Sequence, residues 1–251
     1  MPIKEAIQAL IPRLIKLIPP KLHFEHEKSS DVELLALELL RLWNKQPYRK
    51  NWFVFMKLNF FPNLPSYTQI YHRIERLGEA IDAFQQTPQQ VGMLLIDSFP
   101  LPVCRPKRSA SAKVRFASMG FGTQGKVFGF KCHAWLSTEG QLIQHIILPA
   151  NEHDFSAACQ LNAKWIDFGC PKMIGDKAYV SASFITPPKI NATRVDHRWK
   201  KEYGALRIKI ERTFSWLVGV GLRTPQIKTL KSLKARVAIA FLAHNLWFGN
   251  P

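Results

Sequence analysis

"LLIDSFPLPVC", residues 94–104, is the stretch of sequence on which the fold of this chain depends. Apolar residues lead up to a single carboxylate, Asp97, and Pro100 and Pro102 then interrupt the run. A short apolar run bounded by turn-forming residues is typical of a buried strand. We therefore predict a strand over residues 91–97 that ends on Asp97.

The segment after Asp97 is strongly basic. No Asp or Glu occurs from Ser98 to Thr138, whereas this segment carries Arg105, Lys107, Arg108, Lys113, Arg115, Lys126 and Lys131. The whole chain has 35 Lys and Arg against 18 Asp and Glu, a formal net charge of +17. Nucleic acid is therefore the leading partner, and an ordinary basic or ribosome-associated protein is the alternative.

The composition indicates a globular chain without a membrane segment. Its 251 residues are 47% apolar, which suits one large domain or a main domain with a smaller one. The N-terminal region lacks the unbroken apolar core of a signal peptide, and no later apolar run is long enough to cross a bilayer. We therefore expect a cytoplasmic protein with no membrane partner.

The four cysteines are widely spaced and form no C-x-x-C motif. We interpret them as reduced thiols of a cytosolic protein. The alternative is a zinc site formed by Cys104, Cys132, His133 and His153.

Helical patterns fill the first ninety residues. Ser30 with Glu33, and Ser66 with Gln69, have the spacing of capping boxes, and each pair precedes an apolar segment of helical period. We predict a small all-helical N-terminal domain, residues 1–88, that serves DNA binding or assembly.

Two of these helices are separated by the turn-rich residues 59–66, as in a helix-turn-helix motif. The second helix would then present Arg73 and Arg76 to a DNA groove. An ordinary helical hairpin with a solvated face is the alternative.

The remainder, residues 89–251, changes to a mixed α/β pattern. After the first strand we expect a hairpin of two strands, at residues 126–138 and 141–150, and then a helix at residues 152–168. A further strand at residues 171–176 ends on Asp176, and two helices follow it at residues 197–218 and 232–247. The fold class is thus α/β.

Two aspartates occupy equivalent positions in this predicted pattern. Asp97 and Asp176 each end a short apolar strand, and neighbouring strand ends bring such residues together. Because two close carboxylates repel, we expect a divalent cation such as Mg²⁺ between them. Glu211, on a predicted helix, would complete the site, although a surface salt bridge with Arg207 or Arg212 is its ordinary role.

Asp154 is the strongest competing acid. It follows a predicted strand and opens a predicted helix, so we interpret it as an N-cap and not as part of the site.

Four motifs resemble, in order, signatures of bacterial insertion-sequence transposases of the DDE superfamily: "LLIDSFPLPVC", "LPANEHD", "GDKAY" and "KIERTFSWL". The first motif, with the preceding "SSDVELLALELL", is most similar to insertion-sequence family 982. The resemblance implies a ribonuclease H-like catalytic domain in which Asp97, Asp176 and Glu211 are the catalytic, metal-binding acids. Two Mg²⁺ ions, for which Mn²⁺ can substitute, would be the cofactors.

A related tyrosine-arginine-glutamate-lysine signature is met only in part. Tyr203, Arg207 and Glu211 are in line, but Val218 stands near the position expected for the lysine.

The resemblance implies a DNA transposase that cleaves at the ends of its mobile element and transfers the strand into target DNA. Its partners would be double-stranded element ends and target, bound by a homodimer or larger assembly in the bacterial nucleoid. A ribonuclease H-like nuclease that cuts without joining, or an inactive recruited DNA-binding protein, are the alternatives. We expect the DNA contacts to come from Arg73, Arg76, Arg105, Lys107, Arg108, Lys131, Lys177, Arg198, Lys200, Lys201, Arg207 and Arg212.

Overall fold

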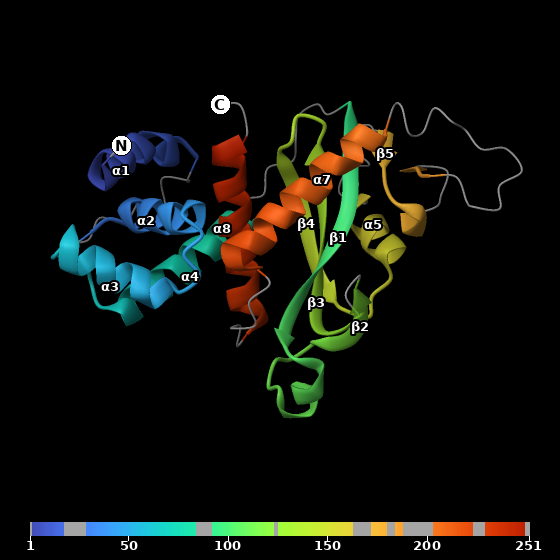
Figure 1. Ribbon diagram of the computed structural model, residues 1–251, viewed down its shortest axis with the longest axis horizontal. Helices are drawn as coiled ribbons and strands as arrows, with labels where there is room; N and C mark the ends of the chain where they lie inside the picture. Colours follow the sequence, from blue (N-terminus) through green and yellow to red (C-terminus); the bar gives the residue numbers. More distant parts are fainter. Residues whose placement is uncertain are drawn as a thin grey trace, which may run out of the picture. The chain divides into compact units, whose positions relative to one another are not determined.

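The fold is described from a computed structural model (Figure 1). The residues that the structure describes are 2–17, 29–83, 92–122, 125–162, 172–179, 184–187, 203–222 and 229–248. They form two compact units. The first unit is Met1–Phe84 with Gly219–Leu222 and Lys231–Ala243, and the second is Gln85–Val218, Arg223–Leu230 and His244–Pro251.

The first unit is helical in its described residues. Its helices are α1 (Ile3–Leu17), α2 (Asp31–Trp43), α3 (Arg49–Asn59), α4 (Tyr67–Ala83) and most of α8 (Leu230–Phe248). The capping box of α2 is confirmed, because Ser30 Oγ accepts the Glu33 N–H at 3.1 Å and the Ser30 N–H reaches the Glu33 carboxylate at 2.8 Å. The same reciprocal bonds join Ser66 and Gln69 at the start of α4.

Part of the last helix, α8, also belongs to this unit. A Cβ at Gly78 of α4 would lie 2.6 Å from the Ala235 carbonyl oxygen of α8, so only glycine permits this approach. The Trp43 indole donates to the Ala243 carbonyl at 2.9 Å, and Lys231 pairs with Glu79 at 3.0 Å.

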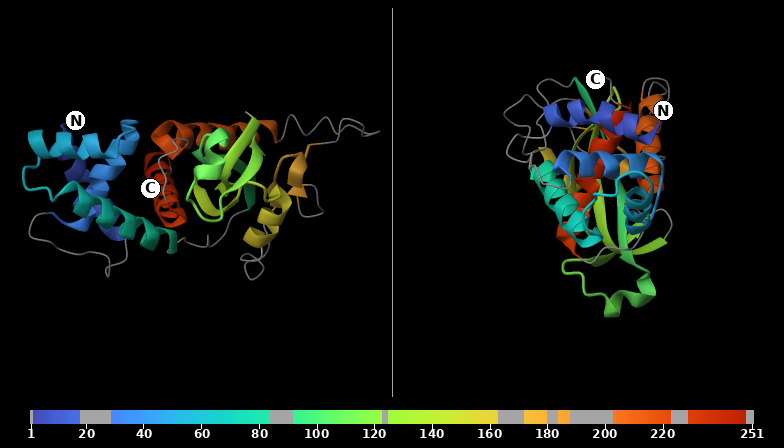
Figure 2. Two further views of the ribbon diagram at one scale, coloured as in Figure 1. Left: turned by 90° about the horizontal axis from the view of Figure 1, so that it is seen from below. Right: turned by 90° about the vertical axis from the view of Figure 1, so that its left-hand side faces the viewer.

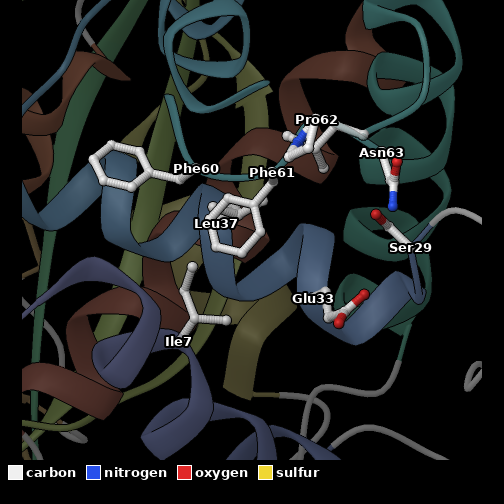
Figure 3. A pocket seen from close by; sticks show the side chains of 9 residues that line it. Ile7, Ser29, Glu33, Leu37, Phe60, Phe61, Pro62 and Asn63 are labelled. Carbon is white, nitrogen blue, oxygen red and sulfur yellow. The ribbon is translucent and has the colours of Figure 1, made fainter. Parts of the chain in front are cut away.

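A pocket of about 260 Å³ lies in the same unit (Figure 3). Ile7 of α1 and Leu37 of α2 supply apolar lining, and Phe61 closes it from the α3–α4 connection. Glu33 also lines the pocket, but its carboxylate already serves the capping box of α2.

Charged side chains are buried within the first unit and are paired there. Glu38 of α2 lies 2.8 Å from Arg41 and 2.6 Å from Arg49 of α3. Asp31 binds both Arg73 and Arg76 of α4. Since an unpaired buried charge is costly, these pairs fix α2 against α3 and α4.

Replacing Glu38 by Gln tests this network. Burial alone would raise the pKa of Glu38, but Arg41 and Arg49 overcome that effect and hold it at about 2. The stability that this carboxylate contributes is therefore present above its ordinary pKa and is lost as pH falls from about 4.5 toward about 2. We expect Glu38→Gln to lower the free energy of unfolding at pH 7 by roughly 3–5 kcal/mol, because two buried arginines lose their partner.

Urea denaturation at pH 3, 5 and 7 measures this effect, with the exposed Glu5→Gln as the control. A loss no larger than that of the control, at every pH, would contradict the role given to Glu38.

The second unit is built on a six-stranded mixed sheet with the strand order β2-β3-β1-β5-β6, in which β4 also pairs with β3. The strands are β1 (Met93–Cys104), β2 (Ser118–Gly122), β3 (Gly125–Ser137), β4 (Leu142–Pro149), β5 (Lys172–Ile174) and β6 (Phe184–Ile185). Pairs β1–β3, β2–β3 and β3–β4 are antiparallel, whereas β1–β5 and β5–β6 are parallel. The sheet is flanked by helices, so the predicted α/β class and the β3–β4 hairpin are confirmed.

Helices α5 (Asp154–Asn162) and α7 (Gly204–Leu217) cover opposite faces of this sheet (Figure 1 and the left view of Figure 2). Phe99 packs against Phe214 of α7, with ring centroids 4.7 Å apart. Toward α5, Leu94 and Ile96 join a buried cluster with Trp135, Ala158, Met173, Tyr179 and Phe184. Because side chains alternate along a strand, Asp97 shares the α7 side with Phe99, and Ser98 lies on the α5 side.

The predicted end of the first strand is wrong. Strand β1 continues past Asp97 to Cys104 and stays paired with β3, with Asp97 opposite Ala134 and Pro100 opposite Lys131. The prolines are tolerated because β5 pairs only with residues 93–95, and no other described strand follows that edge of β1. The sequence also gave no indication of β2. The predicted helical residues 163–168 and 197–202 lie outside the described part of the chain.

Candidate active site

The pairing of β1 with β5 brings Asp97 and Asp176 together. Met93 pairs with Lys172, and Leu95 with Ile174, in a parallel register of constant offset. Extending this offset by two residues places Asp176, which follows the end of β5, beside Asp97, and the charge of Asp176 accordingly acts on the pKa of Asp97. The Asp176 carboxylate accepts the Ala178 N–H at 2.8 Å and so begins a short 3₁₀ turn, Lys177–Tyr179. The predicted strand ends on Asp176, but β5 ends at Ile174, two residues earlier, whereas Asp97 lies within its own strand.

The surroundings of Asp97 favour the neutral, protonated form of its carboxyl group. Burial raises its pKa to about 6, although the Ser98 N–H, donated at 2.7 Å, lowers it in part. The negative charges of Asp176 and Asp154 raise this pKa further, and the positive charge of Arg207 lowers it. Asp97 therefore lies close to two other acids and one arginine, which is an environment that a bound cation would stabilise.

Helix α7 packs against β1 (Figure 1) and carries Arg207 and Glu211. Ile210, Phe214 and Leu217 are buried, while the Glu211 side chain is 56% exposed. Arg207 Nη2 lies 3.3 Å from Glu211 Oε1, the ordinary salt bridge considered from the sequence. Arg207 also lowers the pKa of Asp97, so its guanidinium lies near enough to act on both Asp97 and Glu211.

The described residues do not form a closed metal site as they stand. Among them, no three His, Cys, Asp or Glu side chains are grouped closely enough to hold an ion. Asp97 and Asp176 are brought together, and Glu211 is connected to them through Arg207. The same grouping criterion gives no zinc site from the described Cys and His side chains, and Cys104, Cys132 and Cys159 form no disulfide with one another.

Asp154 lies on the α5 side of the sheet and contacts the strands. Its carboxylate accepts bonds from Ser98 Oγ at 3.3 Å and Lys131 Nζ at 3.2 Å, and lies 3.7 Å from His133 Nδ1. Asp154 is the first residue of α5 and not its N-cap, since His153 Nδ1 accepts the Phe155 N–H instead. The N-cap interpretation is therefore wrong.

His133 is fully buried beside Asp154. Burial lowers the pKa of His133 to about 4, even though Asp154 acts in the opposite direction. The imidazole is therefore neutral at pH 7, and Lys131 is the cation that balances Asp154.

Tyr179 was missed by the sequence analysis as a component of this region. It is fully buried, and burial together with Asp154, Asp97 and Asp176 raises the pKa of its phenol. Its ring packs on Gly175, where an added Cβ would come within 2.9 Å of the Tyr179 side chain. The only sequence signal was that Gly175, Asp176 and Tyr179 occur together in "GDKAY".

The residues predicted to bind DNA occupy several different environments. Arg105, Lys107, Arg108 and Arg212 are exposed, whereas Lys131 is paired with Asp154 and its side chain is only 17% exposed. Arg73 and Arg76 already bind Asp31 in the first unit, with side-chain exposures of 12% and 47%. The side chain of Lys177, and the whole of Arg198, Lys200 and Lys201, fall outside the described part of the chain.

Comparison with known proteins finds a similarity to one family model over part of the chain. Residues 87–204 match the family model described as "Transposase DDE domain". The matched segment contains Asp97, Asp154 and Asp176 and ends before Glu211. This similarity, together with the mixed α/β sheet, supports a DDE transposase.

No curated protein and no solved structure matches the chain. Within the described residues, no helix combines the length and apolar character needed to cross a bilayer.

Replacing Asp97 by Asn tests the electrostatics of the site, because Asn keeps an oxygen that accepts the Ser98 N–H. The pKa of Asp97 is raised from 3.8 to about 6, so its favourable contribution is present below pH 3.8 and is lost as pH rises through about 6. Without divalent ions, we expect Asp97→Asn to raise the free energy of unfolding at pH 7.5 by roughly 1–3 kcal/mol. Near pH 4 the gain should disappear.

Urea denaturation in EDTA at both pH values measures the difference, with Glu5→Gln as the control. A gain that is equal at pH 4 and pH 7.5 would show that the carboxylate is not under this strain.

Proposed function

We propose that this chain is a DNA transposase of insertion-sequence family 982 that cleaves at the ends of its element and transfers the cut strand into target DNA. The observation that carries the proposal is the convergence of Asp97 and Asp176 within the segment that matches a transposase DDE domain. A ribonuclease H-like arrangement accounts for the mixed sheet with acids on adjacent strands and a further acid on α7.

Asp97, Asp176 and Glu211 are the residues that would hold two Mg²⁺ ions, or Mn²⁺ in their place. The raised pKa of Asp97 supports this assignment, because it arises in part from neighbouring carboxylates. Mg²⁺ binds groups of carboxylate oxygens of this kind. When bound, the ions would lower the pKa of a water molecule and offset charge on the phosphate oxygens. Glu211 would exchange its pairing with Arg207 for this role, which frees the guanidinium to bind a DNA phosphate.

The rest of the chain supplies contacts with DNA in this proposal. Exposed cations of the second unit bind the backbone of element ends and target, and the N-terminal helices α3 and α4 contribute end recognition or assembly. Joining two ends requires a dimer or larger complex. Because Arg73 and Arg76 already bind Asp31, their first role is to hold α4 on α2, and contact with DNA is secondary.

A metal-binding readout separate from catalysis tests the cofactor assignment. Adding about 10 mM Mg²⁺ should raise the melting temperature of the protein by roughly 2–4 °C, because the ion binds only the folded site. Asp97→Asn and Asp176→Asn should each abolish this increase, and EDTA should reverse it. An equal Mg²⁺ effect on parent and variants would contradict the assignment.

The catalytic prediction uses the full chain, Mg²⁺ and a labelled duplex that carries the element end. A transposase yields cleaved and strand-transfer products on sequencing gels. We expect Asp97→Asn, Asp176→Asn and Glu211→Gln to reduce both products at least about 100-fold, since each removes a metal ligand. Glu139→Gln, an exposed acid on the β3–β4 turn, is the matched control and should keep parent activity.

The outcomes separate the alternatives. Cleavage without joining would make the chain a nuclease, and a mobility shift without cleavage would make it a DNA-binding protein. Full activity of Asp97→Asn would refute the site itself.

A further inference from the structure

The segment between β1 and β3 forms a basic arm, which we define as residues 105–122 together with Lys126. It comprises the 3₁₀ helix Pro106–Ser111, a turn at Arg115 and Phe116, strand β2, and the first residues of β3. In Figure 1 the arm extends from the end of β1 that lies away from β5. A strand rises about 3.3 Å per residue, so Cys104 lies roughly 23 Å from Asp97, and the arm is separate from the catalytic acids.

The charge of the arm is of one sign. Its six basic side chains are exposed, and none forms an ion pair with another described residue; they are Arg105, Lys107, Arg108, Lys113, Arg115 and Lys126. No acid occurs anywhere in the arm. A surface of this kind attracts a polyanion and repels a second copy of itself.

Large apolar side chains lie among these cations and are exposed to solvent. Phe116 is 73% exposed, Phe121 is 70% exposed and Met119 is 40% exposed. Simple electrostatic binding of a phosphate backbone needs no such rings. Their exposure therefore calls for a ligand that offers a flat apolar face.

Two features of the backbone hold the rings outward. On β2, Met119 and Phe121 alternate with Gly120, whose backbone lies so close to Ala150 that an added Cβ would come within 1.9 Å of the Ala150 oxygen. This contact at Gly120 turns the neighbouring side chains to the opposite face. Phe116 has φ of 65°, a left-handed conformation that is costly for an aromatic residue, and burial does not repay the cost.

We propose that the basic arm binds unpaired bases of DNA, with Phe116 and Phe121 stacked on them and the surrounding cations on the phosphates. The faces of bases are hidden in a duplex and become available only where pairing is lost. Aromatic rings within a basic groove are the usual means of binding such bases without sequence preference. This inference rests on the proposed function, because that function makes DNA the polyanion, and it assigns to the arm a distorted or frayed segment of the DNA.

The test uses the full-length Asp97→Asn protein, so that cleavage does not interfere. Its affinity is measured by fluorescence anisotropy at 150 mM salt for two 30-base-pair probes of equal sequence on one strand. One probe is fully paired, and the other carries a three-nucleotide bubble with 2-aminopurine in place of one unpaired base. We expect the bubble probe to bind about 10-fold more tightly or better, with a change in 2-aminopurine fluorescence.

The arm variants give the decisive comparison. Phe116→Ala with Phe121→Ala should lose most of the preference for the bubble and change duplex affinity less than about twofold. Phe116→Trp with Phe121→Trp should retain it, because tryptophan also stacks. Lys113→Gln with Arg115→Gln should weaken both probes alike and reduce the salt dependence by about two phosphate contacts.

Three results would overturn the proposal: equal binding of both probes by the parent, an equal loss on both probes for the alanine variant, or a change of oligomeric state in sedimentation when the rings are removed. The last would identify the rings as a protein interface. If the bubble preference holds but the Asp97-containing protein neither cuts nor joins DNA, the proposed function fails and the binding site of the arm stands.

Discussion

The parallel pairing of β1 with β5 is the constraint on which the candidate site depends. It extends over only three residues of each strand, yet it fixes the offset that brings Asp97 and Asp176 to one edge of the sheet. The arrangement is unfavourable by itself, because burial and neighbouring acids raise the pKa of Asp97. Local destabilisation of this kind is expected where a protein holds its ligands ready for a cation.

Arg207 has a particular place in this balance. It pairs with Glu211 and at the same time lowers the pKa of Asp97, so it partly compensates the acids within the protein itself. Phe99 and Phe214 hold α7 against β1 and thereby keep the guanidinium at the site. Asp154 is balanced separately by Lys131 on the other side of the sheet, which makes it a poorer candidate ligand despite its proximity.

The sequence predicted those features that depend on local patterns. Apolar runs that precede Asp97 and Asp176 predicted adjacent strands, and the Ser30 and Glu33 spacing predicted the start of α2. The continuation of β1 was not predictable, since Pro100 and Pro102 resemble a turn until the free edge of the strand is known. The contacts of Asp154 with Ser98 and Lys131 depend on strand pairing between distant segments, which no spacing in the chain reveals.

The sharing of α8 between the two units affects the order in which the protein is completed. The ribosome makes the N-terminal helices first, but Gly78 and Trp43 find their partners Ala235 and Ala243 only after the entire sheet has been synthesised. The helices that are synthesised first are therefore among the last parts of the chain to complete their packing. Until α8 is made, the surfaces of α2 and α4 that pack against it are uncovered, and transiently exposed apolar surface favours aggregation.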